Sequence, residues 1–294
     1  MKFDDFQKSN FFGFLNVNKP KGMSSHDVVY YVRRLLGVKQ VGHSGTLDPM
    51  AEGVLVVGVG KATRLFEFLK EEKEYIATLR FGYESETLDV EGECIKKEDF
   101  FPDEEELKSV LVEFLGESEQ IPPKYSAIKV GGKKLYELAR KGQDVGEIKA
   151  RPIKIKNIEL IEINENEAKI KVACSKGTYV RSLVRDIAKK LGTVAVMSDL
   201  IRTKSGAFEI ENAFEINEYL EKEDVVNSFV NPIEVLDYQK MEVSETQWLK
   251  IKNGAFIENT GFLENEIILL TYENELVSVG QVVGSKIIQK KVMI

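Results

Sequence analysis

The chain has 294 residues, of which 43% are hydrophobic and 30% charged, and its 41 Lys and Arg against 48 Asp and Glu give a net charge of −7. This composition is typical of a globular protein of about two domains and excludes a disordered or collagen-like chain. No apolar run reaches the roughly 20 residues of a membrane span, and the N-terminus has no apolar signal-peptide core. Two distant cysteines and two histidines argue against a disulfide scaffold or a metal site, so we expect a cytoplasmic protein without metal.

Hydrophobic periodicity, caps and turn residues predict the elements of the first half of the chain. In chain order these are a strand at 14–17, a helix that begins at Ser24 or Ser25 and ends at Gly37, a loop at 42–49, a strand at 51–59, a helix at 62–69, a strand at 74–82 and an amphipathic helix at 103–115.

The second half continues with two strands, a helix and a strand-rich end. The predicted elements are strands at 153–163 and 168–173, a helix at 179–191 that Gly192 ends, a boundary near Pro232, and strands at 267–271, 276–282 and 287–292. Helices interrupt the strands without a regular βαβ rhythm, which favours an α+β fold over a doubly wound one.

Charge is segregated along the chain. Residues 84–121 have a net charge of −11 and 209–245 of −9, whereas 122–156 and 169–208 have +7 each. One interpretation is that acidic blocks are exposed helices and basic blocks are solvated strands and loops. The other is a basic working surface for an anionic partner on a protein kept soluble by its acidic flanks, because local potential steers a partner more than net charge does.

The most informative segment is GHSGTLDP at 42–49. Its glycines allow backbone conformations that other residues resist. Asp48 lies between Leu47 and Pro49, in an apolar and stiff setting where partial desolvation makes a carboxylate reactive if a cation offsets its burial. The alternative is an Asp-Pro turn in which the carboxylate bonds only its own backbone.

Residues 42–60, GHSGTLDPMAEGVLVVGVG, resemble the signature of the TruB family, the bacterial tRNA pseudouridine-55 synthases. The likeness spans about residues 12–208, and such a series of motifs is far more specific than a single GTLDP. The other segments that resemble the family, in the same order, are LNVNKPKGMSS at 15–25, KEYIATLRFG at 73–82, IPPKYSAIKVGGKKLYELARKG at 121–142, RPIKI at 151–155, CSKGTYVRSLVRDI at 174–187 and LIRTKSGAF at 200–208.

The resemblance implies an isomerisation without a cofactor, in which a uridine of the tRNA T loop is detached from ribose C1′ and reattached through carbon 5. Asp48 is similar to the family's catalytic aspartate, and Arg181 is similar to an arginine that pairs with it. Tyr75 is similar to the tyrosine that stacks on the target base. The remaining residues that the resemblance assigns to the substrate site are Tyr179, Leu200, His43, Lys19 and Pro20.

Each of these residues has a structural interpretation when it is taken alone. Tyr75 suits cross-strand packing, Tyr179 and Leu200 suit a core, and His43 suits an exposed loop. Lys19 and Pro20 suit an ordinary solvated turn. Residues 86–92, ETLDVEG, keep only loosely an acidic pattern of the family, so we expect them not to touch the proposed chemistry and assign no contacts to residues 84–92.

The basic stretch 124–151 is similar to a family insertion that folds over the T loop of tRNA. Its cations and tyrosines suit phosphate contacts and stacking. The residues expected to bind RNA are Lys124, Lys129, Lys133, Lys134, Arg140, Lys141 and Arg151.

The expected architecture is a pseudouridine synthase catalytic domain at 1–235 and a small β-rich PUA-like domain at 236–294. The first would hold a mixed, largely antiparallel central sheet with flanking helices. We expect a tRNA T stem-loop as partner, no cofactor, no membrane, no obligate protein partner and a monomer. Two alternatives remain: a pseudouridine synthase with another RNA target, and an RNA-binding protein that folds tRNA without catalysis.

Overall fold

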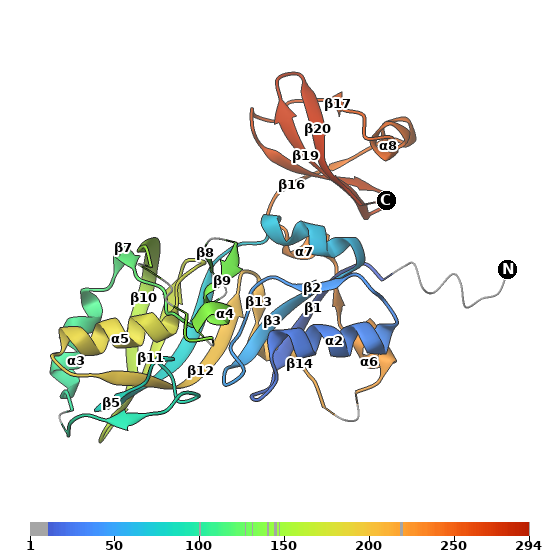
Figure 1. Ribbon diagram of the computed structural model, residues 1–294. Helices are drawn as coiled ribbons and strands as arrows, with labels where there is room; N and C mark the ends of the chain where they lie inside the picture. Colours follow the sequence, from blue (N-terminus) through green and yellow to red (C-terminus); the bar gives the residue numbers. More distant parts are fainter. Residues whose placement is uncertain are drawn as a thin grey trace.

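The computed structural model describes residues 11–293 apart from 100, 127, 131, 140, 144, 145, 147, 218 and 219. These residues form a large mixed sheet and a separate five-stranded sheet (Figure 1). The main path of the large sheet runs β14 (Phe214–Glu215), β1 (Gly13–Lys19), β3 (Glu52–Val59), β12 (Ala195–Ser205), β4 (Lys73–Phe81), β11 (Glu167–Cys174), β10 (Arg151–Asn164) and β7 (Gly116–Gln120). Off this path, β2 (Val41–His43) pairs with β3, β13 (Phe208–Glu209) with β12 and β15 (Phe229–Val230) with β1.

Helices cover this sheet and connect its strands. In chain order they are α2 (Ser25–Leu36), the 3-10 helix η1 (Gly60–Phe68), α3 (Glu104–Val112), α4 (Leu135–Ala139), α5 (Val180–Lys190), the 3-10 turn η2 (Ile210–Asn212), α6 (Lys222–Asn227) and α7 (Pro232–Val235). Two short ribbons lie outside the sheet, one of β5 (Tyr83–Glu84) and β6 (Ile95–Lys96), the other of β8 (Lys129–Val130) and β9 (Lys133–Lys134).

Strand β3 is buried on both faces. Successive side chains of a strand point to opposite sides, so they enter two different cores. Leu55 and Val57 pack toward α2, which Ser24 caps with a reciprocal Ser24–Asp27 capping box. Val54 and Val56 pack on the other face, against η1 and the five-stranded sheet. This explains why residues 51–59 are apolar throughout instead of alternating.

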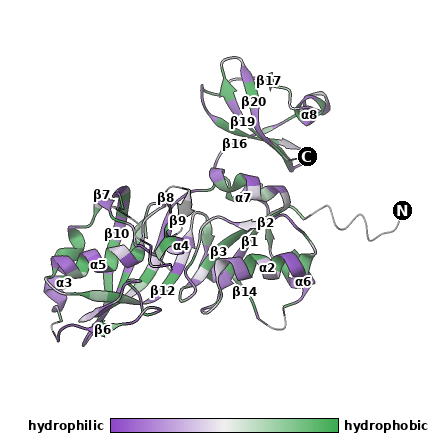
Figure 2. Cartoon of the chain, in the orientation of Figure 1, coloured by the Kyte–Doolittle hydropathy of each residue, from purple (hydrophilic) through white to green (hydrophobic). Residues whose placement is uncertain are grey.

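The other half of the large sheet builds a second core under α3 and α5, which lie together in Figure 1. Figure 2 shows hydrophobic and hydrophilic segments on both helices, as expected of helices with one buried face. The two halves meet where β3 and β12 pair in parallel, with Ile201 opposite Glu52 and Arg202 opposite Gly53. The GHSGTLDP segment leads directly into this seam.

The five-stranded sheet follows α7 and runs β16 (Gln239–Glu242), β18 (Ile267–Tyr272), β19 (Glu275–Val283), β20 (Lys286–Val292) and β17 (Ile257–Glu258), with α8 (Glu245–Lys252) beside it. Its inner residues Leu269 and Val279 share a core with Phe14 of the large sheet. Lys291 also pairs with Glu67 of η1 at 2.9 Å. The two sheets therefore share buried apolar surface.

The α+β prediction, with a mixed and largely antiparallel sheet, is confirmed. The described strands of the large sheet pair in parallel only at β1–β14 and β3–β12. Two predictions were incomplete. The loop predicted from residue 42 begins after β2, and the long strand β12 was not predicted, because its sequence AVMSDLIRTKS mixes polar and apolar residues without clear alternation. Strand β12 nevertheless occupies the centre of the sheet, between β3 and β4.

No helix of the described chain is long and apolar enough to cross a membrane.

Gly53 is predicted to be essential for the seam. It has φ +103°, and a Cβ at this position would lie 2.9 Å from the amide nitrogen of Arg202. We expect Gly53→Ala to lower the free energy of unfolding by about 3 kcal/mol, because it combines backbone strain with a clash against another strand. Urea denaturation measures the loss. Gly37→Ala is the control, since Gly37 has φ +69° but open space around it, and about 1 kcal/mol is expected. Equal losses in both variants would contradict this account of the seam.

Candidate active site

The loop that holds Asp48, residues 44–51 (the Asp48 loop), is fixed by backbone contacts at both ends. The Ser44 amide donates to the Val56 carbonyl at 3.0 Å, and the Ala51 amide donates to the Asp48 carbonyl at 3.1 Å. In the middle, the Ser25 hydroxyl accepts from the Leu47 amide at 2.8 Å and donates to the Leu47 carbonyl at 2.9 Å. The Leu47 side chain is buried in the core under α5. The loop is therefore held against α2 and the sheet.

Two buried cations also bind this loop through its carbonyl groups. Arg202 is 1% exposed and donates to the carbonyls of Gly45 at 3.1 Å and Val54 at 2.6 Å. The fully buried Lys19 ammonium donates to the carbonyls of Met23 at 2.6 Å and, more weakly, Pro49 at 3.3 Å. Burial lowers the pKa of Lys19 to about 8.

Pro20 completes this anchor, since its carbonyl accepts from the Lys19 ammonium at 2.8 Å. Lys19 and Pro20 thus link the turn after β1 to the end of the Asp48 loop. A solvated turn, the alternative interpretation, does not describe Lys19.

Asp48 forms an ion pair with Arg181 from the first turn of α5. The Arg181 Nε lies 3.0 Å from the Asp48 Oδ2, and the two side chains are 7% and 32% exposed. Burial raises the pKa of Asp48 above that of an ordinary aspartate, and Arg181 opposes this effect. The carboxylate is thus partly desolvated, next to a fixed guanidinium and still reachable from one side.

Arg181 binds a second carboxylate as well. Its Nη1 lies 3.3 Å from Asp89 Oδ2, and Asp89 is only 1% exposed. The same guanidinium donates to the carbonyls of Thr87 and Tyr125, both at 2.9 Å. Asp89 is held in turn by the Thr87 hydroxyl at 2.6 Å. Asp48, Arg181 and Asp89 form a cluster of two acids and one base, in which Arg181 and Asp89 are buried and Asp48 is partly exposed.

The expectation that residues 86–92 do not touch the proposed chemistry was wrong. Thr87 and Asp89 both bind Arg181, although 94 and 92 residues separate them from it along the chain. The signal was present in the TLDVEG segment, where an aspartate follows a threonine at a spacing that allows a local side-chain bond. The contacts of Arg202 were not predicted from the sequence either, because only the pairing of β12 with its neighbouring strands brings this residue to the Asp48 loop.

The aromatic and apolar candidates line the same side of the sheet. Tyr75 is 7% and Leu200 is 5% exposed, and both belong to the core that contains Leu47. Tyr75 pairs with Arg202 across β4 and β12, and Leu200 lies two residues before Arg202. Burial raises the pKa of Tyr75. Tyr179 is the N-cap residue of α5, two residues before Arg181, and its backbone amide donates to Gln120 Oε1 at 2.8 Å.

His43 ends β2 and packs edge-on against His26, with 6.2 Å between ring centroids. Its Nδ1 is buried and has no hydrogen-bond partner among the residues that the structure describes, and burial lowers the pKa of His43. An exposed surface histidine, the alternative interpretation, is therefore wrong. No three His, Cys, Asp or Glu side chains within the described ranges are grouped to hold a metal ion.

The basic stretch 124–151 adjoins the cluster through its first residues, because Tyr125 binds Arg181. Lys124, Lys141 and Arg151 are exposed. Lys129, Lys133 and Lys134 lie on the β8–β9 ribbon, while Arg140 lies outside the described residues.

Comparison with known proteins places this arrangement among RNA-modifying isomerases. The fold resembles a chain in the "Crystal Structure of a Cbf5-Nop10-Gar1 Complex" with a TM-score of 0.69 and 25% identity, over 100% of this chain and 88% of that one. A chain of "Crystal structure of the archaeal box H/ACA sRNP Nop10-Cbf5 complex" has a TM-score of 0.71 at 24% identity. These likenesses identify the pseudouridine synthase fold.

The sequence itself is more specific. The model of the TruB family pseudouridylate synthase N-terminal domain matches residues 33–180, and that of the tRNA pseudouridylate synthase B C-terminal domain matches 181–236. A relative named tRNA pseudouridine synthase B from Caldanaerobacter subterraneus is 44% identical over 95% of this chain and 98% of its own length. One of the same name from Clostridium tetani is 42% identical over 92% and 95%. The chain belongs to the TruB family of pseudouridylate synthases, and it is therefore an isomerase.

Asp89 is predicted to position Arg181. We expect Asp89→Asn to lower the single-turnover rate of pseudouridine formation by roughly 10- to 100-fold, since a hydrogen bond to a charged group contributes about 1.5–3 kcal/mol. The negative charge of Asp89 raises the pKa of Asp48. Its removal should therefore move the acid limb of the pH–rate profile to lower pH.

Glu167→Gln is the matched control, because Glu167 pairs with Arg80 at 2.8 Å in a partly exposed position. A pair of this kind contributes little, so the rate and the pH profile should not change. An Asp89→Asn enzyme with a wild-type rate and an unmoved acid limb would contradict the positioning role.

Proposed function

We propose that this chain isomerises uridine 55 in the T loop of tRNA to pseudouridine, with Asp48 as the essential catalytic group. The observation that carries the proposal is the ion pair of Asp48 with Arg181 at 3.0 Å, next to the buried core that contains Leu47, Tyr75 and Leu200. The relatives named tRNA pseudouridine synthase B, which match over almost the whole chain, support tRNA as the substrate.

The chemistry needs no cofactor. The bond between N1 and C1′ breaks, a bond between C5 and C1′ forms, and a proton passes from C5 to N1, so that atoms and electrons balance. Asp48 can attack C1′, add to C6 of the ring or promote elimination to a glycal. Each route requires the ionised carboxylate, which Arg181 stabilises in a partly desolvated setting.

The target base must leave the stacked loop to reach Asp48. Stacking of a base on an aromatic ring contributes about 1–3 kcal/mol, which offsets part of the cost of extrusion. Tyr75 of β4 supplies such a ring, and Leu200 of β12 supplies an apolar wall. Tyr179, His43, Lys19 and Pro20 complete the assigned substrate site by shaping or anchoring it.

The remaining assignments concern RNA outside the pocket. The exposed Lys124, Lys141 and Arg151, with the β8–β9 lysines, would contact phosphates of the T stem-loop. We assign residues 1–235 to catalysis and 236–294 to a PUA-like module. The enzyme would act on tRNA as a single chain without an obligate protein partner.

The direct test uses a T stem-loop RNA and measures release of tritium from carbon 5 of labelled uridine. Wild type should form one pseudouridine per RNA, at position 55. Asp48→Asn should bind the RNA normally but lose activity by at least about a thousandfold, as expected when an essential group is removed. Asp99→Asn, at an exposed aspartate that pairs with Lys96, is the matched control and should keep full activity.

Each other result identifies a different function. Product formed by Asp48→Asn at the wild-type rate would refute the catalytic assignment. RNA binding without product from wild type would indicate a tRNA-folding protein. Product on another RNA, with none on the T stem-loop, would indicate a pseudouridine synthase with a different target.

A further inference from the structure

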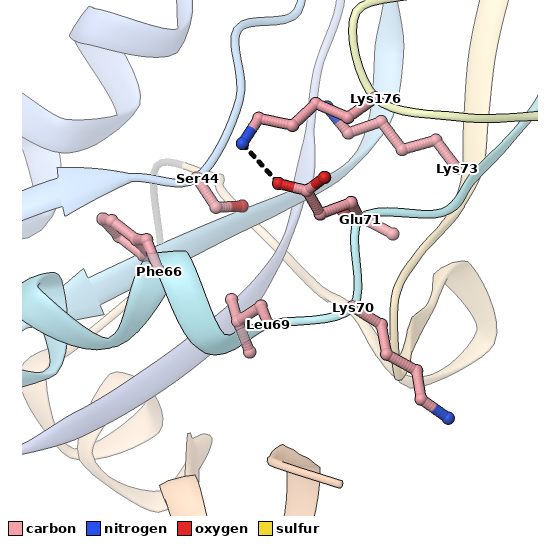
Figure 3. A pocket seen from close by; sticks show the side chains of 8 residues that line it. Ser44, Phe66, Leu69, Lys70, Glu71, Lys73 and Lys176 are labelled. Atoms are coloured by element: carbon pink, nitrogen blue, oxygen red, sulfur yellow. Dashed lines mark hydrogen bonds and ion pairs between the residues drawn. The ribbon is translucent and has the colours of Figure 1, made fainter. Parts of the chain in front are cut away.

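Beside Ser44, at the start of the Asp48 loop, lies a small pocket that the proposed chemistry does not use (Figure 3). It lies where three neighbouring strands meet the loop, since Lys73 of β4 pairs with Ser205 of β12 on one side and Cys174 of β11 on the other. The residues that line it are Ser44, Phe66, Leu69, Lys70, Glu71, Lys73, Lys176 and Ser205.

The lysines of this pocket differ in their partners. Lys70 pairs with Asp237 at 2.7 Å. Lys176 pairs with Glu71 at 2.6 Å, the contact drawn as a dashed line in Figure 3. Lys73 forms no ion pair with any carboxylate in the described part of the chain. The lining therefore carries one uncompensated positive charge.

The surroundings of Lys73 disfavour its positive charge, because the ammonium is buried and lies near other cations. Its ammonium reaches under the Asp48 loop, where a Cβ on Gly45 would lie 2.7 Å from its Nζ and 3.8 Å from Arg202 Nη1. Burial and the neighbouring Arg202 and Lys176 lower the pKa of Lys73 to about 8. Burial raises the pKa of Cys174 to about 11, so this thiol supplies no counter-charge at neutral pH. A desolvated cation beside other cations favours an anionic ligand.

The position of Lys73 relative to Tyr75 and Asp48 indicates which anion it binds. Lys73 and Tyr75 lie on the same face of β4, about 6.6 Å apart along the strand. Gly45, against which the ammonium packs, is three residues from Asp48. A base stacked on Tyr75 would thus bring its own backbone phosphate near Lys73. The hydroxyls of Ser44 and Ser205 line the same pocket and can donate hydrogen bonds.

We propose that Lys73, Ser44 and Ser205 form a subsite for one phosphodiester of the substrate RNA, next to the nucleotide that enters the active site. This inference rests on the proposed function for the identity of the RNA. The subsite holds the backbone where it must rotate to extrude the base, and it anchors the strand to the Asp48 loop.

The test is a coupling experiment between protein and RNA. Each phosphate flanking the target uridine is replaced in turn by a neutral methylphosphonate, and RNA dissociation constants are measured for wild type, Lys73→Gln and Lys73→Arg. We expect wild type to bind one substituted RNA about tenfold more weakly. Lys73→Gln should bind unmodified RNA about tenfold more weakly, be indifferent to that same substitution, and lose about 0.7 from its slope of log affinity against log salt. Lys73→Arg should restore most of the affinity.

Lys171→Gln is the matched control, because Lys171 lies on the neighbouring strand β11 but pairs with Glu74 on the opposite face of the sheet. It should leave affinity and coupling unchanged. If Lys73→Gln fails to fold, the Ser44→Ala/Ser205→Ala variant tests the same coupling. The subsite would be overturned if the losses of affinity from Lys73→Gln and from each methylphosphonate simply added at every phosphate. Unchanged RNA affinity in folded Lys73→Gln would also overturn it. Product formed by wild type on the T stem-loop without any coupling refutes only the subsite, whereas no product refutes the proposed function.

Discussion

The site depends on one buried guanidinium. Arg181 binds Asp48 and Asp89 and two backbone carbonyls, and these partners come from the Asp48 loop, the segment after β5 and the start of the basic stretch. A buried charge is tolerated only when its partners satisfy it. The contacts that stabilise Arg181 therefore also fix the distances between three chain segments, and the carboxylate of Asp48, whose pKa burial raises, has a cation beside it.

The other buried cations have a different role. Lys19 and Arg202 direct their donors to carbonyl oxygens of the Asp48 loop and its surroundings, which shapes the loop without neutralising Asp48. Within the described chain, Arg181 is the cation that pairs directly with Asp48. Because Lys19 and Arg202 bind the loop backbone and Arg181 binds the Asp48 side chain, the loop is rigid while the carboxylate keeps its reactivity. The cost of burying these groups is met by a sheet that encloses apolar residues on both faces of β3.

Much of this arrangement could be predicted from sequence, and the exceptions share one cause. Helix α2 is marked locally by its Ser24 cap and by Gly37, and the Asp48 loop is marked by its glycines. Arg202 and Lys73 reach the site only through strand pairing, so no local pattern marks them. Asp89 has a local Thr87 partner, but its contact with Arg181 depends on a helix far along the chain. The polar sequence of β12 conceals a central strand for the same reason, since its environment is set by β3 and β4.

The central claim is that Arg181 acts on Asp48 and is not chiefly an RNA contact. Arg181→Lys tests it most directly, because lysine keeps the charge but lacks the planar fork that binds two carboxylates and two carbonyls. Single-turnover rate and RNA dissociation constant should be measured on the same T stem-loop. We predict a rate lowered by about a hundredfold or more with nearly unchanged RNA affinity. Equal losses of rate and affinity would contradict the claim and make Arg181 a phosphate contact.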